Sequence, residues 1–258
     1  MKGRIIYILL FSVFTLPINL NLVASEEMTA DDIINTMTET LNPEESKGKM
    51  KMTIMTSTGQ ERTFEYQTFS KDGGEKSLMK YIKPSRVKDQ AILMLNDAND
   101  IWIYFPRTKR IRKLATHAKK QKLEGGDFSY KDMGGSDAFI EEYNAVRLKD
   151  EKKEARICYK LELKRKAESN ASYSRVILWV DKETFIPLVI DYYHEDDPSL
   201  WEKQLVCSDI KLIDSIYTPM KCVMYNKLDN THTSMEIIEV TYNVDLSDDI
   251  FTEMGMQK

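Results

Sequence analysis

The fold is decided by the stretch Ser46–Lys83, which reads SKGKMKMTIMTSTGQERTFEYQTFSKDGGEKSLMKYIK. Apolar side chains recur at every second position in much of it, which is the period of a half-buried β-strand and not of a helix. Turn-forming residues at 58–60 and 71–74 divide the stretch into strands at 46–57, 61–70 and 75–83. The stretch therefore predicts a three-stranded antiparallel meander.

The lengths of the two loops predict how these strands pair. A three-residue first loop and a four-residue second loop give the pairs Ile54 with Phe64, Met52 with Tyr66, Phe64 with Tyr81 and Tyr66 with Met79. On the other face Glu65 then lies opposite Thr53 and Lys80. One face of the meander is thus expected to carry methionine and aromatic side chains, and the other to be solvated with an opposite-charge pair.

A second meander is expected at 90–96, 101–105 and 110–114, with turns at 97–100 and 106–109. The first turn gives the pairs Leu95 with Trp102, Leu93 with Tyr104, Met94 with Ile103 and Ile92 with Phe105. Both faces of this part are apolar, so we expect a helix or lid to pack over it. Further strands are expected at about 155–164, 172–181, 186–193, 201–212, 217–226 and 231–243.

One helix precedes the strands. Thr29 is a good N-cap with Asp32 three residues on, and Met28 is placed to act as a hydrophobic staple. The apolar face at helical spacing consists of Ile33, Ile34, Met37 and Leu41, and Asn42-Pro43 ends the helix. One helix, about a dozen strands and one helical insertion predict a mainly β fold with few helices, built on a single large, strongly curved antiparallel sheet.

The first 24 residues have the pattern of a secretory signal peptide. Lys2 and Arg4 precede an apolar run at 5–16, and Ala24 offers a small residue for cleavage. A run of about a dozen apolar residues is too short to span a bilayer, although an uncleaved membrane anchor is the alternative. We therefore expect a signal peptide at 1–24 and a single β domain at 25–258 in an exported protein.

The composition argues against a general nucleic-acid-binding protein. The chain has 37 Lys and Arg residues against 41 Asp and Glu residues, and two of the cations lie in the expected signal peptide. Nucleic-acid binding depends on an excess of positive charge, which this chain lacks. Hydrophobic residues make up 42% of the chain, which is enough for a folded core.

The expected strands predict where each of the three cysteines lies. A two-residue turn at Asp214-Ser215 places Cys207 directly across from Cys222, within bridging distance in an oxidising compartment. This pair is either a cross-strand disulfide or two small buried thiols. Cys158 lies in an alternating strand, and we expect it to be a core residue.

No motif of an enzyme or a metal site is present in the sequence. It contains no G-x-S-x-G elbow, no P-loop and no H-E-x-x-H. His117, His194 and His232 are far apart and none has metal-ligand spacing. We expect no catalytic residue, no metal and no cofactor.

Basic residues gather between 107 and 122, where no acidic residue occurs. The candidate dock for anionic lipid headgroups or an acidic partner consists of Arg107, Lys109, Arg110, Arg112 and Lys113, and the run continues with Lys119, Lys120 and Lys122. Alternatively, these charges protect an exposed strand and its loop from edge-to-edge pairing.

The region at 115–145 loses the strand pattern. Gly125-Gly126 and Gly134-Gly135 flank a short helix-like piece at 127–133, with Phe128, Tyr130 and Met133 on its apolar side. This arrangement suits a movable lid, and it equally suits an ordinary long connection.

The apolar side chains of the two meanders have two interpretations as well. They either fill a closed core or line a pocket, for which adaptable methionines are suited. The candidate cavity residues are Met50, Met52, Ile54, Phe64, Tyr66, Met79, Tyr81, Leu93, Leu95, Trp102 and Tyr104.

Several segments together resemble the outer-membrane lipoprotein-sorting protein family. They are 81–88 (YIKPSRVK), 102–106 (WIYFP) with Arg110 and Arg112, 126–133 (GDFSYKDM), 159–163 (YKLEL) and 179–182 (WVDK). The resemblance implies a LolA-like incomplete β-barrel with a helical lid over an apolar cavity. It implies a periplasmic carrier that shields acyl chains of lipoproteins or lipids, with an inner-membrane exporter or an outer-membrane acceptor as partner. The alternative is an interaction module, or an accessory subunit of a lipid exporter, that carries no lipid.

Overall fold

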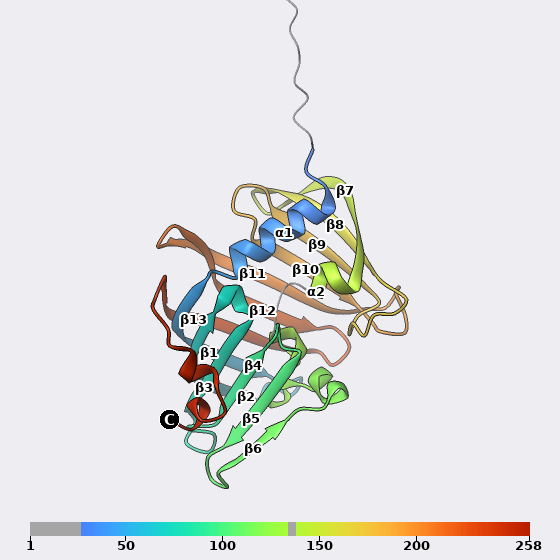
Figure 1. Ribbon diagram of the computed structural model, residues 1–258. Coiled ribbons are helices and arrows are strands. Elements are labelled where there is room, and N and C mark those ends of the chain that lie inside the picture. The colour runs from blue at the N-terminus through green and yellow to red at the C-terminus, as the bar shows by residue number, and fades with distance from the viewer. Residues whose placement is uncertain (1–26, 134–137) are drawn as a thin grey trace, which may run out of the picture.

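The computed structural model describes residues 27–133 and 138–258. The expected signal peptide at 1–24 and the Gly134-Gly135 pair lie outside the described residues. The described part is built on one antiparallel sheet of thirteen strands in the order β6-β5-β4-β3-β2-β1-β13-β12-β11-β10-β9-β8-β7 (Figure 1). Because β6 and β7 stand at opposite ends of this order, the sheet is not closed, and Figure 1 shows that it is strongly curved.

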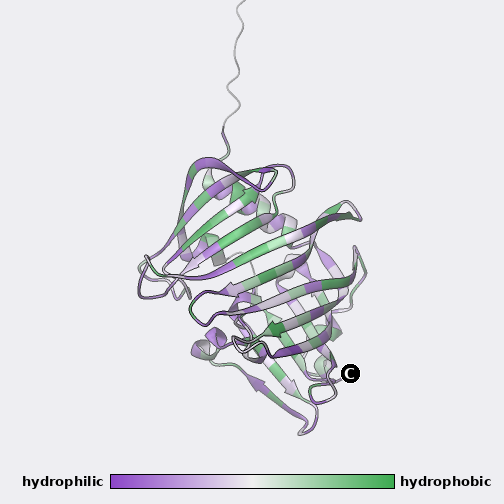
Figure 2. Cartoon of the chain, turned by 180° about the vertical axis from the view of Figure 1, so that it is seen from behind, coloured by the Kyte–Doolittle hydropathy of each residue, from purple (hydrophilic) through white to green (hydrophobic). Residues whose placement is uncertain are grey.

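Most strands follow one another as hairpins. The strands are β1 Glu45–Met55, β2 Glu61–Lys71, β3 Lys76–Lys83, β4 Ala91–Leu95, β5 Asp100–Phe105, β6 Arg110–Lys113, β7 Tyr143–Lys153, β8 Arg156–Arg165, β9 Arg175–Asp181, β10 Pro187–Tyr193, β11 Trp201–Ile213, β12 Ile216–Asn226 and β13 Thr231–Tyr242. Apolar and polar segments alternate along them (Figure 2), as expected of a sheet that buries one face. The predicted mainly β, curved antiparallel fold is confirmed.

The first meander forms with the predicted faces but a different register. Phe64 pairs with Met52 instead of Ile54, because β1 ends at Met55 and the loop has five residues instead of three. Tyr66 pairs with Tyr81 instead of Met79, and a bulge places Glu65 opposite Lys83. Each register differs by two or three positions, and the pairs Ile54 with Phe64, Met52 with Tyr66, Phe64 with Tyr81, Tyr66 with Met79, Glu65 with Thr53 and Glu65 with Lys80 are wrong.

The second meander also differs by two positions. The turn begins at Asn96, so Leu95 pairs with Asp100 and Leu93 with Trp102. The predicted pairs Leu95 with Trp102, Leu93 with Tyr104, Met94 with Ile103 and Ile92 with Phe105 are therefore wrong. Both faces of β4 are buried, as expected, and the cover over the outer face is the C-terminal segment, through Leu246, Phe251 and Met256.

The first helix covers the concave face of the sheet. Helix α1, Ala30–Leu41, begins at the N-cap Thr29, whose side chain and Asp32 form a capping box. Ile33, Ile34 and Met37 are fully buried in the main core. The helix contacts β7, β12 and the short helix α2, Ala138–Glu142 (Figure 1). The predicted helix and its buried face are confirmed.

The connection from β6 to β7 runs between the two edges of the open sheet. Its described part contains short 3₁₀ helices at Thr116–Lys120, Leu123–Gly125 and Lys131–Met133. The piece at 127–133 is therefore not one helix, because only its last three residues are helical. Strand β7 falls partly in the region where no strand was predicted, and it is an edge strand with mostly exposed or half-buried side chains.

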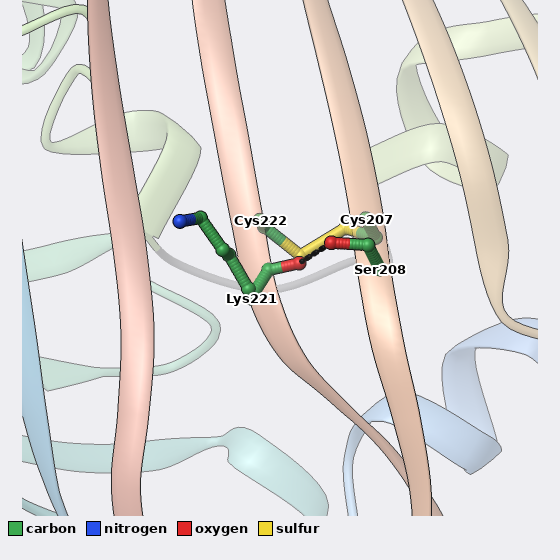
Figure 3. Close-up of a disulfide and its surroundings, with 4 residues drawn as sticks. All are labelled: Cys207, Ser208, Lys221 and Cys222. Carbon is green, nitrogen blue, oxygen red and sulfur yellow. Dashed lines mark hydrogen bonds between the residues drawn. A yellow bond between two sulfur atoms is a disulfide. The ribbon is translucent and has the colours of Figure 1, made fainter.

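A disulfide joins Cys207 of β11 to Cys222 of β12 (Figure 3). The two residues are direct cross-strand partners, and the turn lies at Asp214-Ser215 as predicted. Cys158 is fully buried and reduced. Among the described residues, no helix has the length and apolar character needed to cross a membrane.

Removing the disulfide tests its contribution to the sheet. The bridge spans 15 residues of sequence, and in the chain-entropy model a loop of that size contributes about 3 kcal/mol. We expect the double variant Cys207→Ala, Cys222→Ala to lose about that much free energy of unfolding, measured by urea denaturation. Reduced wild-type protein should match the variant, and a variant as stable as oxidised wild type would show that the bridge is dispensable.

Candidate functional site

Helix α1, the connection and the concave face of the sheet surround a cavity of about 310 Å³, called here the first cavity. Its wall is largely apolar and comes from elements far apart in sequence. It includes Met37, Phe128, Met133, Ile190, Leu205 and Met224, and the Cys207–Cys222 disulfide. Leu205 and Met224 are cross-strand partners on β11 and β12, so the sheet itself forms the floor.

One end of the first cavity is polar. Lys131 donates to both carboxylate oxygens of Glu142, at 2.7 and 3.0 Å, and to the Asn170 carbonyl at 3.1 Å. Ser172 also lines this cavity, and its Oγ is buried without a hydrogen-bond partner among the described residues. Buried polar atoms are usually paired, so an unpaired hydroxyl facing a cavity suggests a polar ligand atom or a water there.

A second polar group lies beside this end. The Tyr173 hydroxyl is 3.4 Å from both carboxylate oxygens of Asp132, and the Lys203 ammonium donates to that hydroxyl at 3.1 Å. Lys203 is only 6% exposed. Burial raises the pKa of Tyr173 well above its ordinary value, and the nearby Asp132 carboxylate adds to the effect. The phenol therefore stays neutral and links the connection to the sheet.

A second cavity, also of about 310 Å³, lies over β1 to β4. Its wall includes Met50, Met79, Ile92 and Met94 from the sheet and Ile237 from β13. Leu41 and Met133 line both this cavity and the first one.

A larger, polar cavity of about 550 Å³ borders the first one. It is lined by charged residues of both signs, among them Lys119, Lys120 and Glu141. Lys131 and Glu142 line this polar cavity as well as the first cavity. Their ion pair therefore lies where the apolar cavity and the polar cavity meet.

The methionine and aromatic stripe of the first meander mostly fills the core. Phe64, Tyr66 and Tyr81 are at most 1% exposed, and the ring centroids of Tyr66 and Tyr81 lie 5.7 Å apart. Burial raises the pKa of both tyrosines. Met52 and Ile54 are buried in the same core, and neither they nor the three aromatic residues line any cavity described above. Of the stripe, Met50 and Met79 do line a cavity.

The remaining candidate cavity residues lie on the opposite face of the sheet. Leu93 and Tyr104 are buried in the cluster beneath the C-terminal segment, and Leu95 and Trp102 pack against that cluster. The structure therefore does not bring them together with Phe64 or Met79. Ile92 and Ile103 alternate with these residues along β4 and β5 and face the main core. The two sets of side chains therefore lie on opposite faces of the sheet.

The predicted lid residues lie at the cavities, but their segment is anchored. Phe128 and Met133 line the first cavity, and Tyr130 packs against the main core. Asp127, 2% exposed, accepts hydrogen bonds from the hydroxyls of Thr231 and Thr233 on β13.

The glycine before this anchor is required by close packing. A Cβ on Gly126 would lie 3.0 Å from the Thr233 hydroxyl and 3.1 Å from the Ile54 side chain. Gly126 therefore allows the connection to pack closely against the sheet. This close packing, and not hinge motion, explains why a glycine stands at this position.

The basic run divides into paired and unpaired residues. Lys113 is 2.5 Å from Asp100, Lys120 is 2.5 Å from Glu195 and Lys122 is 2.6 Å from Asp229. Each of these three lysines forms an ion pair with a carboxylate elsewhere in the fold. By contrast, Arg107, Lys109 and Arg110 are exposed and make no ion pair within the described part of the chain. They flank the start of β6, an edge strand, so the dock and the edge-protection interpretations both fit.

Residues 27–133 and 138–258 contain no cluster of His, Cys, Asp or Glu able to hold a metal. The histidines do not converge, and His232 packs beside the ring of Tyr225. Burial raises the pKa of the Cys158 thiol, which makes it a poor nucleophile.

Sequence reasoning missed the polar groups of the first cavity. Lys131 and Glu142 both belong to the connection between β6 and β7, whereas Lys203, which donates to the hydroxyl of the cavity residue Tyr173, belongs to β11. The only local signal was a lysine at 203 followed by apolar alternation at Leu205 and Cys207, which places Lys203 on the inner face of β11.

Comparisons with known proteins give one family model and several solved structures with a similar fold. A family model described as "Uncharacterized protein" matches residues 73–258. A DUF1329 family protein from Desulfovibrio piger is 27% identical, with a TM-score of 0.80 over 88% of this chain and 97% of that one. A search of curated proteins gives no match.

Two further solved structures share the fold. One is a domain assigned to outer membrane lipoprotein sorting, from Vibrio parahaemolyticus, with 22% identity and a TM-score of 0.79 over 88% of this chain and 97% of that one. The other is a LolA superfamily protein from Nitrosomonas europaea, with 24% identity and a TM-score of 0.72 over 88% and 98%.

The anchor at Asp127 predicts how the connection is held. We expect Asp127→Ala to lower the free energy of unfolding by about 2–3 kcal/mol, because the hydroxyls of Thr231 and Thr233 lose a charged acceptor. We also expect faster proteolysis within 121–133. Asp127→Asn keeps one acceptor oxygen and should cost less, and the exposed Glu168→Ala is the control. Equal stability of Asp127→Ala and Glu168→Ala would contradict the anchor.

Proposed function

This chain belongs to the family whose model matches residues 73–258 and has a LolA-like fold, and from that premise we propose that it is a periplasmic carrier of acyl chains. In this role it takes up the acyl chains of lipoproteins or lipids in its apolar interior and delivers them between the membranes of the envelope. The expected signal peptide at 1–24 agrees with export to the periplasm.

The observation that carries the proposal is the first cavity. It is walled largely by apolar side chains from α1, the connection and the sheet, and at its polar end Lys131 and Glu142 also line a larger polar cavity. An amphiphile has the same division into an apolar chain and a polar head. Burial of each methylene contributes about 0.8 kcal/mol, so about ten methylenes supply about 8 kcal/mol, the free energy of a micromolar dissociation constant. No covalent chemistry is needed.

Delivery requires a surface that meets a membrane or a partner. The exposed Arg107, Lys109 and Arg110 stand at one edge of the open sheet, with no carboxylate paired to them among the described residues. In a chain with a net charge of −4 this basic edge suits anionic lipid headgroups or an acidic face of an exporter or acceptor. The proposal assigns docking to this edge.

One observation favours a second candidate function. Phe64, Tyr66 and Tyr81 pack tightly in a closed core, and such a filled core is what an interaction module would have. In that case the chain would bind a partner protein, for example as an accessory subunit of a lipid exporter, and would carry no lipid.

Binding of lipid separates the two candidates. We expect native mass spectrometry of protein purified gently from the periplasm to show near-stoichiometric acyl lipid or lipoprotein, with lipid extraction identifying its class. A clean mass of the protein alone, with no uptake of offered phospholipid, would instead support the interaction module.

A pair of lysine substitutions tests the location. Leu205→Lys places a charge in the wall of the first cavity and should weaken lipid retention at least tenfold, because burying an unpaired ammonium is costly. Ile111→Lys makes the same change at a half-buried position on the opposite face of the sheet and should leave retention unchanged. Equal retention in both folded variants would remove the first cavity from the site.

A further inference from the structure

We propose that the interior holds two acyl chains, one in the first cavity and one in the second, with the side chains of Leu41 and Met133 between them. This inference rests on the proposed carrier function and names the class of its cargo as two-chain lipids or lipid anchors. The juxtaposition that carries it is two largely apolar cavities of equal volume over one sheet, with two lining residues in common.

The two cavities share a partition. Leu41 ends helix α1, and Met133 ends the anchored segment that begins at Asp127. Both side chains line both cavities, and both pack against the main core while remaining half-buried. Two elements that are distant in sequence thus meet over the concave face and divide the space beneath them.

Each cavity has a size suited to one chain. Its volume of about 310 Å³ lies at the lower end of the range for small-ligand pockets, which is about 300–1,000 Å³. One chain of a lipid is a ligand of that size, whereas a whole two-chain lipid is larger. The space for the second chain lies on the far side of the partition.

The walls of both cavities contain several methionines. Met37 and Met224 line the first cavity, and Met50, Met79 and Met94 line the second. Methionine side chains are unbranched and flexible, so they adapt to an apolar chain without a fixed shape. The same property lets Met133 change its rotamer when both cavities fill.

The polar groups are placed for the part of the lipid that joins the chains. Lys131 and Asp132 immediately precede Met133, and Ser172, with its unpaired buried Oγ, lines the first cavity. Because Lys131 and Glu142 also line the polar cavity, a head joined to both chains near the partition would extend toward that cavity. An ester or amide group at the junction can accept a hydrogen bond from the unpaired Ser172 hydroxyl.

Counting bound single chains tests the inference. The probes are palmitate, which has one chain, and a dipalmitoyl phosphatidylglycerol, which has two, each titrated into delipidated full-length mature protein and followed by native mass spectrometry. We expect wild type to saturate at two palmitates or one phosphatidylglycerol. Leu205→Trp fills the first cavity and Thr68→Trp fills the second, so each variant should saturate at one palmitate.

Controls keep the count interpretable. Gln67→Trp is the matched control, because Gln67 is exposed on the other face of β2 beside Thr68, and it should still bind two palmitates. Thermal unfolding shows which variants are folded, and the smaller substitutions Leu205→Phe and Thr68→Leu replace any tryptophan variant that is not.

The outcomes distinguish this inference from the carrier function itself. Saturation of wild type at one palmitate, or two palmitates still bound by the folded Thr68 variant, would overturn the two-chain inference and leave the carrier function standing. Absence of any binding of palmitate and phosphatidylglycerol to wild type would overturn the carrier function, and the two-chain inference with it.

Discussion

The open edges of the thirteen-stranded sheet set the main constraint on this structure. A curved sheet that does not close leaves an apolar concave face, which must be covered if its side chains are to leave water. Helix α1 supplies Ile33, Ile34 and Met37 to that face, and the connection between β6 and β7 supplies Phe128. These two covers are separate segments of the chain. The cavities lie where these covers meet the sheet.

The opposite face of β3 to β5 is covered in a different way. The C-terminal segment packs Phe251 and Met256 against Leu93 and Tyr104, and the Lys76 ammonium pairs with Asp248 at 2.9 Å. This explains why β4 is apolar on both faces, since each face has its own cover. A strand buried on both sides cannot show from its sequence which residues face a cavity, and so Leu93 and Tyr104 were grouped with Phe64 although they face the other way.

The two-residue period of the sequence predicted which side chains share a face of the sheet, although the predicted pairings within the two meanders were wrong. A shift of two residues keeps every side chain on its face, so the apolar face of the first meander was predicted although Phe64 pairs with Met52. The pairing of Cys207 with Cys222 was correct because a two-residue turn leaves little freedom. Strand β7 was missed because an edge strand presents charged and exposed residues such as Val146 instead of an alternating apolar face. The Lys131–Glu142 pair depends on tertiary packing, which no local pattern encodes.

The interior combines a rigid part with an adaptable part, and this division fits a carrier. Around Tyr66 and Tyr81 the aromatic rings fill the core and fix the curvature of the first meander. Beside them, methionines line the second cavity, and the disulfide of β11 and β12 holds the floor of the first one. In the proposed carrier, the disulfide holds β11 and β12 together whether or not a ligand is bound. The binding free energy of the ligand is therefore not needed to keep the shape of this wall.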